Sequence, residues 1–117
     1  SAADMFRSMA ALANLRERVV AAVAAYDFVL SPVMPVAAFA ADAALPNLRR
    51  GLESVCFTAP INQTEAPAAS INCGYSRSGV PIGLHIVGQR HDDMGVLRLA
   101  KVYEDARADQ RPWPEPV

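Results

Sequence analysis

The chain contains 117 residues, 52% of them hydrophobic, with 11 basic side chains against 12 acidic ones. A length within ~100–150 residues suits one globular unit, so residues 1–117 are expected to form a single domain. The net charge of −1 provides no attraction for a polyanion, which argues against nucleic-acid binding. No apolar run reaches the ~18–20 residues of a membrane span, and the start does not resemble a signal peptide's basic start, so a cytoplasmic protein is expected.

The first thirty residues predict a helix followed by a strand. Over residues 2–25, apolar side chains recur near helical spacing, at Met5, Met9, Leu12, Leu15, Val19 and Val23. The short apolar run Phe28-Val29-Leu30 is bounded by Ser31-Pro32 and is typical of a strand buried on both faces, as in a parallel sheet.

The middle of the chain predicts a loop and a second helix. Residues 36–45 are rich in alanine without clear periodicity and are expected to form a loop. Asn47 can cap a helix over about residues 48–59, which Pro60 should end or bend. Asn62-Gln63-Thr64 matches a glycosylation acceptor, but a helix-end loop that satisfies free backbone groups is favoured, because no secretory start is present.

The last fifty residues predict a β-hairpin and a final helix. Alternating apolar residues at Ala69, Ile71 and Cys73 are followed by a glycine-containing turn at 76–79 and by residues 81–88, where Ile82, Leu84 and Ile86 share a face. Asp92 or Asp93 then caps a helix. Its inward residues are expected to be Val96, Leu97, Ala100 and Tyr103, and the proline-rich tail 111–116 should lie extended on the surface.

These elements predict an α/β fold with a small mixed β-sheet, one strand plus a β-hairpin, packed with helices. The connection from the first strand to the hairpin should be a right-handed crossover. The two cysteines lack a C-x-x-C spacing and are expected to be small buried hydrophobes.

Few side chains suggest chemistry by themselves. His85 and His91, with Asp92 and Asp93, could form a metal or general-base site, but His85 lies within a strand and His91 in the loop beyond it. A wall histidine and a capping loop are the favoured interpretation. The serines at 70, 76 and 78 lack a glycine-rich elbow, so the residues themselves predict no catalytic group, no metal and no cofactor.

Three stretches carry a resemblance to a known family. They are "FTAPINQT" (57–64), "APA" (66–68) and "GVPIGLHIVG" (79–88), preceded by "YDFVLSP" (26–32). In this order, from about residue 15 to residue 114, the chain resembles the carboxy-terminal region of the amidase signature family. The resemblance implies hydrolysis or transfer of carboxamides by a serine nucleophile, a second serine in a cis peptide and a lysine.

The chain has no Gly/Ser-rich stretch for that nucleophile, and its single lysine, Lys101, falls on the polar face of the last helix. The resemblance therefore implies a scaffold and pocket wall, with no catalytic residue and no activity in the isolated chain. It makes four residues candidates for the substrate pocket: Met34, Asn62, Thr64 and Glu65. The expected partner is the missing amino-terminal catalytic portion or, through an exposed sheet edge at 28–30, a second copy; a non-catalytic interaction module is the alternative function.

Two positions depart from the family pattern. Glu65 stands where glycine is usual after "N-x-T", and a non-glycine residue there would lose ~1–2 kcal/mol in a left-handed backbone. Either the loop is reshaped or Glu65 has a pocket role. His85 stands where glutamine is usual in "G-L-Q", which changes the hydrogen bonds expected on that strand face.

Overall fold

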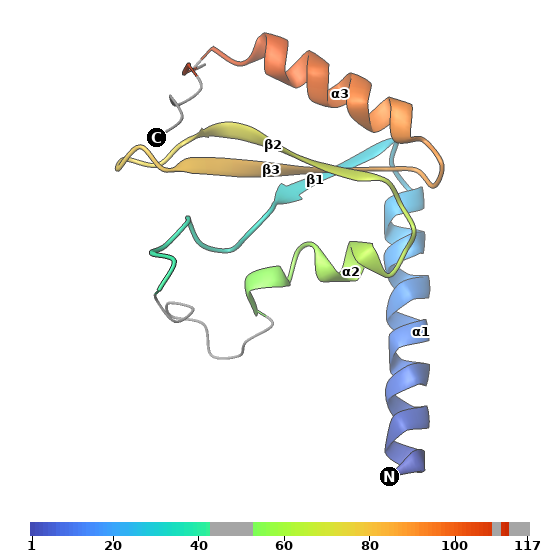
Figure 1. Cartoon of the computed structure of the whole chain (residues 1–117). Helices are drawn as coiled ribbons and strands as arrows, with labels where there is room; N and C mark the ends of the chain where they lie inside the picture. Colours follow the sequence, from blue (N-terminus) through green and yellow to red (C-terminus); the bar gives the residue numbers. More distant parts are fainter. Residues whose placement is uncertain (43–52, 109–110, 113–117) are drawn as a thin grey trace.

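A three-stranded antiparallel sheet carries the fold, with helix α3 over one face (Figure 1). The computed structural model describes residues 1–42, 53–108 and 111–112. The strands are β1 (Phe28–Pro32), β2 (Ala68–Tyr75) and β3 (Pro81–Gly88), in the order β1-β3-β2. The α/β architecture of one strand plus a hairpin is confirmed.

The directions of the strands differ from the expected mixed sheet. β1 pairs antiparallel with β3, with Phe28 opposite Gly88 and Pro32 opposite Leu84, so a parallel crossover does not arise. The apolar run of β1 suggested burial on both faces, but within the described residues β1 pairs with β3 alone, and Leu30 is 54% exposed. A three-residue apolar run reports burial and not strand direction, so sequence could not decide this point.

The core lies along the second half of the central strand β3. Ile86 and Val87 are 0% and 1% exposed, on opposite faces of the strand. Gly88 allows α3 to approach, since a Cβ there would come within 2.6 Å of Val96 Cγ2. Ile82, expected to share the inward face, is exposed because its partner across the sheet is Gly74, which has no side chain to cover it.

Helix α3 (Asp93–Ala106) begins as predicted at Asp92, whose carboxylate accepts a hydrogen bond of 3.0 Å from the Gly95 amide. Its inward stripe consists of buried Val96 followed by half-buried Leu99, Ala100 and Tyr103. Leu97 was expected to face inward and is instead 57% exposed. One residue along a helix is a rotation of ~100°, which takes Leu97 off that stripe.

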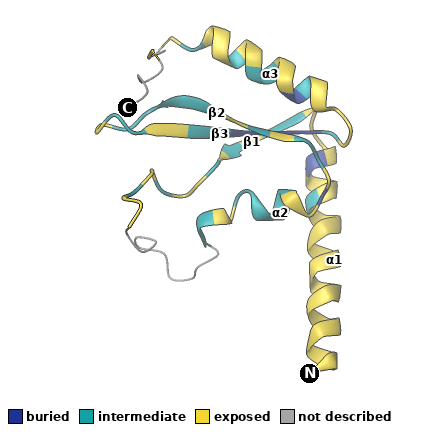
Figure 2. Cartoon of the chain, viewed as in Figure 1, coloured by how far each residue is buried: buried dark blue, intermediate teal, exposed yellow. Residues whose placement is uncertain are grey.

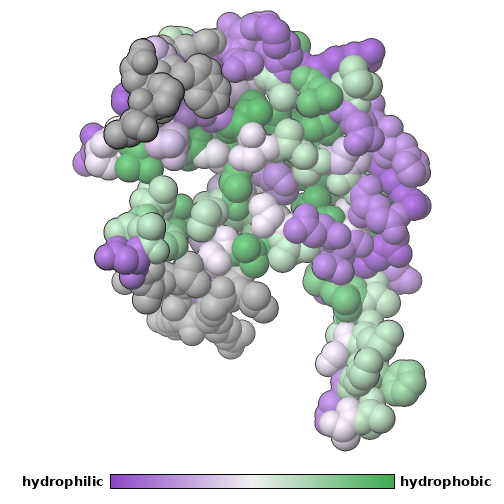
Figure 3. Space-filling view, viewed as in Figure 1, coloured by the Kyte–Doolittle hydropathy of each residue, from purple (hydrophilic) through white to green (hydrophobic). Residues whose placement is uncertain are grey.

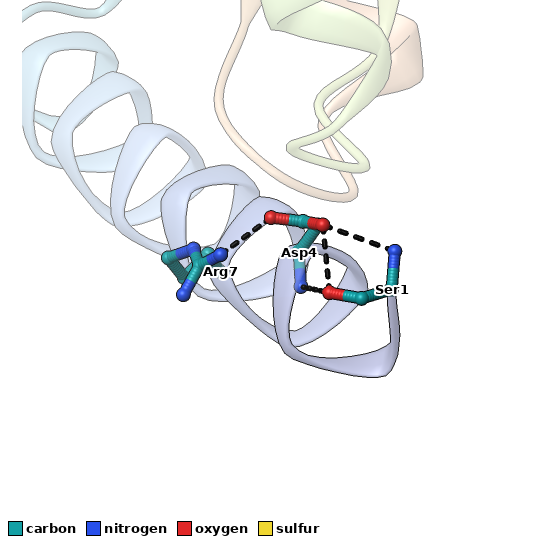
Figure 4. Close-up of polar contacts among 3 residues, drawn as sticks. All are labelled: Ser1, Asp4 and Arg7. Carbon is teal, nitrogen blue, oxygen red and sulfur yellow. Dashed lines mark hydrogen bonds and ion pairs between the residues drawn. The ribbon is translucent and has the colours of Figure 1, made fainter.

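Helix α1 (Ala2–Ala24) has the predicted bounds and begins at Ser1 in a capping box. The Ser1 hydroxyl, the amino terminus and Arg7 surround Asp4 and lower its carboxyl pKa (Figure 4). Gln89 attaches the other end to the sheet, because its side-chain amide donates to the carbonyls of Val23 (3.0 Å) and Tyr26 (2.5 Å). The predicted apolar face is buried only at Val23, and most of the helix projects away from the body (Figure 2).

The segment before the hairpin departs most from expectation. Residues 36–42 form a loop as predicted, while 43–45 and the first part of the predicted helix, 48–52, lie outside the described residues. Residues 53–59 contain a 3-10 turn, η1 (Glu53–Val55), and no continuous helix; α2 (Ala59–Asn62) follows. Pro60 lies in the first turn of α2 instead of ending a helix, a place where its missing N–H is not needed.

The cysteines and the carboxy-terminal tail differ in how far they match expectation. Cys56 is exposed, contrary to prediction, and Cys73 is half-buried. Of the proline-rich tail only 111–112 is described, with the Arg111 guanidinium 3.9 Å from the centre of the Tyr75 ring. Within the described ranges, no helix is both long and apolar enough to cross a membrane.

Candidate functional site

Two of the four pocket candidates line a hollow, and each lines a different one. Met34 lines a hollow of about 540 Å³ between the segment after β1 and the hairpin. Thr64 lines a second hollow of about 330 Å³, between α1 and the residues that follow β3. Glu65 is ion-paired to two arginines of that second hollow, whereas Asn62 is exposed and lines neither.

The Met34 hollow has a mainly apolar wall. Its apolar side chains come from the segment 33–38 and from Ile71 and Ile82, and its polar ones are Ser70 and Asn72. Gly83 determines how closely the segment lies against the sheet, because a Cβ there would come within 2.7 Å of Val33 Cγ2. The Val33 amide also donates to the Gly83 carbonyl at 3.3 Å, so this wall is fixed to β3 by contact and by a backbone hydrogen bond.

Thr64 serves the local backbone. Thr64 is only 4% exposed. Its Oγ1 donates a hydrogen bond to the Ile61 carbonyl at 2.7 Å and accepts one from the Ala66 amide at 3.2 Å. This confirms the predicted use of a hydroxyl at the end of a helix to satisfy backbone groups. Thr64 can shape the second hollow, but its hydroxyl is already engaged.

Glu65 retains the left-handed backbone in which glycine is usual. Its φ of 61° lies in the region that costs a non-glycine residue ~1–2 kcal/mol. Its carboxylate accepts a hydrogen bond from Arg16 of α1 at 3.0 Å and also pairs with Arg90, beyond β3. The loop is therefore not reshaped, and the side chain joins two elements far apart in sequence.

His85 occupies the buried middle of the sheet at 5% exposure. The strand register places Ser31 of β1 and Ser70 of β2 opposite it, and its Nδ1 lies 3.4 Å from Ser31 Oγ. Burial lowers the pKa of His85, because desolvation disfavours the charged imidazolium. Across the sheet, Ser31 and Ser70 therefore offer His85 only weak polar contacts. Neither is a carboxylate that could orient the imidazole as a general base.

The other groups considered from sequence do not join His85. His91 is exposed in the turn before α3, at a φ of 69°. Over residues 1–42, 53–108 and 111–112, no three His, Cys, Asp or Glu side chains are placed to hold a metal ion. Lys101 is exposed on α3, where a hydrogen bond of 2.5 Å to Asp105 raises its pKa and disfavours the neutral amine that a base requires.

Sequence reasoning missed Arg16, Gln89 and Arg90, which frame the second hollow. For Arg16 a signal existed, since it continues the spacing of Met9, Leu12 and Val19 and so falls on the otherwise apolar face of α1. A charged residue on such a face implies a polar partner. No comparable local signal identified Gln89 or Arg90. The partners of Gln89 lie more than sixty residues away in the sequence, and Glu65, the partner of Arg90, lies twenty-five residues away.

The sequence of this chain is similar to those of known proteins. The family model described as Amidase matches residues 2–97. A glutamyl-tRNA(Gln) amidotransferase subunit from Brevibacillus brevis is 43% identical over 80 residues, which are 68% of this chain and 16% of that protein. The subunit of the same name from Thermodesulfovibrio yellowstonii is 36% identical over 87 residues, 74% of this chain and 17% of that protein.

A solved structure gives the same result in three dimensions. The crystal structure of the corresponding glutamyl-tRNA(Gln) amidotransferase subunit from Thermotoga maritima superposes with a TM-score of 0.72 at 27% sequence identity. The superposition covers 91% of this chain and 23% of that one. The chain thus spans less than a quarter of the length of the relatives it matches.

Proposed function

This chain belongs to the amidase family, and from that membership we propose that it forms the carboxy-terminal scaffold and substrate-pocket wall of an enzyme that breaks carboxamide C–N bonds. The family match over residues 2–97 is the observation that carries the proposal. The catalytic serine, the second serine in a cis peptide and the lysine belong to the segment that precedes this part of the fold. The isolated chain is accordingly inactive.

The division of labour follows from the chemistry of amide cleavage. A serine attacks the carbonyl, its proton passes to the bridging serine and lysine, and backbone N–H groups stabilise the oxyanion. The described part of this chain does not present a serine–serine–lysine set, since Lys101 is exposed on α3 and hydrogen-bonded to Asp105. His85 Nδ1 lies 3.4 Å from Ser31 Oγ, which is a long contact for a general base. It supplies a pocket wall instead: Met34 lines an apolar hollow that suits the hydrocarbon part of an amide substrate, and Thr64 lines the second hollow. Asn62, at the end of α2, and Glu65 are kept in the proposal as neighbours of Thr64 in the chain.

The relatives bear the name of an amidotransferase subunit, so the proposal includes transfer of the amide nitrogen as well as hydrolysis. It also includes association with further subunits, and a cytoplasmic location. The first partner in this proposal is the amino-terminal catalytic portion of the amidase. Among the described residues β1 lies at one edge of the sheet, and this edge is a second route of association in the proposal, because an unpaired strand edge recruits another chain.

The test compares the product of the native gene with this 117-residue chain. Intact mass of the native product is measured, and both proteins are assayed on a panel of carboxamides that includes glutamine. We expect a longer, active native product and an inactive chain. A native product of 117 residues that is inactive and monomeric would instead support the non-catalytic interaction module. Activity in the isolated chain would refute the assignment of catalysis to another segment.

A further inference from the structure

Helix α1 has a line of apolar side chains along one face, and this line extends beyond the part of the helix that packs against the rest of the protein. Along one face the spacing alternates between four and three residues, which is the coiled-coil repeat, through Met5, Met9, Leu12, Arg16, Val19 and Val23. The last three positions are used within the chain: Val23 is 6% exposed, Val19 is half-buried and Arg16 pairs with Glu65. The same face continues beyond them without a partner among the described residues.

The exposed part, called here the amino-terminal seam, consists of Met5, Phe6, Met9 and Leu12. These side chains are 66%, 75%, 58% and 46% exposed, and hydrophobic residues line the projecting part of the helix in Figure 3. The nearest charges, Asp4 and Arg7, pair with each other beside the seam (Figure 4). The flanking positions Ser8 and Ala13 carry no charge either.

A charge-free stripe with this spacing fits the groove of another helix, because side chains at alternating steps of three and four interlock with the ridges of a facing helix. We infer that the amino-terminal seam is the surface against which an apolar helix of the amino-terminal portion of the amidase packs. This inference rests on the proposed function and names the contact through which the catalytic portion and this scaffold hold together.

The superposition on the solved relative favours that occupant. The superposition covers 91% of this chain, and the family model matches it from residue 2, so the four seam residues belong to the part of the chain that the family shares. This chain corresponds to only 23% of that chain, so ample further structure is available there to cover the seam. A second copy is a poorer fit, because four side chains are few beside the roughly 20–30 residues a side of a stable interface.

Thiol labelling tests the inference directly. Met9→Cys is introduced into the native gene product and into the 117-residue chain, and the rate of maleimide modification of each introduced cysteine is followed by peptide mass spectrometry. Asn14→Cys is the matched control, since it lies on the opposite side of the same helix and is also exposed. In the native product we expect Met9→Cys to react at least about tenfold more slowly than Asn14→Cys. In the isolated chain the two introduced cysteines should react at similar rates.

A second pair of variants measures the cost of breaking the contact. Met9→Glu should lower the melting temperature and the soluble yield of the native product, whereas Met94→Glu on α3, at the same 58% exposure, should leave both near wild type. Equal labelling of Met9→Cys and Asn14→Cys in the native product would overturn the inference, whatever the activity of that product. Protection in the isolated chain that rises with concentration, together with a doubled mass, would assign the seam to a second copy and also overturn it.

Discussion

Replacing Glu65 separates backbone strain from ion pairing. Glu65→Ala and Glu65→Gly both remove the carboxylate that pairs with Arg16 and Arg90, so both lose the same two contacts. These pairs are about half exposed and are worth ~0–1 kcal/mol each. Only glycine relaxes the φ of 61°. Relief of ~1–2 kcal/mol, less the ~0.5–1 kcal/mol by which glycine's freedom favours the unfolded chain, leaves Glu65→Gly about 1 kcal/mol more stable than Glu65→Ala.

Urea unfolding followed by circular dichroism gives the free energies of the two variants and of the wild type. The measurement is repeated in ~1 M salt, where the Debye length falls to ~3 Å and the exposed ion pairs are screened. High salt should bring the wild type close to Glu65→Ala and leave the difference between the two variants unchanged. An alanine variant as stable as the glycine variant would show that the loop is not held in a left-handed conformation and would refute the reasoning.

Three further predictions follow from burial, titration and capping. Ile86→Ala should lower the free energy of unfolding by ~2–5 kcal/mol, because Ile86 is 0% exposed, whereas Ile82→Ala on the same strand, at 41% exposed, should cost far less in the same urea experiment. Burial lowers the folded-state pKa of His85 below 6.5, so the unfolded chain binds its proton more readily. Wild-type stability should therefore fall as pH drops below ~6.5, and His85→Gln should lack that part of the loss; parallel curves for the two proteins between pH 7.5 and pH 5 would contradict the assignment. Asp92→Ala should lower the free energy of unfolding by ~0.5–2 kcal/mol, because the hydrogen bond from the Gly95 amide is lost. Asp92→Asn should lower it much less, since asparagine can also cap a helix. Equal melting temperatures for the two variants would show that the cap does not stabilise α3.

Local sequence was sufficient for the regular elements whose signals are local. The bounds of α1 and the start of α3 at Asp92 follow from capping groups and helical spacing, which operate within four residues. The hairpin follows from alternation around a turn in which Gly79 takes a φ of 83°. The interrupted segment 53–62 was less predictable, because Pro60 is compatible both with the end of a helix and with its first turn.

The candidate site shows the same division. The role of the Thr64 hydroxyl was predictable because it depends on a nearby helix end, and the left-handed position of Glu65 was suggested by the glycine that the family usually has there. The contacts of Glu65 with Arg16 and Arg90 were not, and neither was the separation of Met34 from Thr64 into two hollows. Each depends on where a distant segment packs, and that information is absent from any short stretch of sequence.

For this protein the sequence by itself determined the secondary structure set by local hydrogen bonding and the family whose residues it shares. Only the tertiary structure decided that β1 runs antiparallel to β3 and that the apolar face of α1 is buried at Val23 but exposed at Met5 and Met9. The physical reason is that burying an apolar stripe is favourable against any apolar surface, so the stripe alone does not determine which segment covers it. That partner is fixed by the packing of segments far apart along the chain.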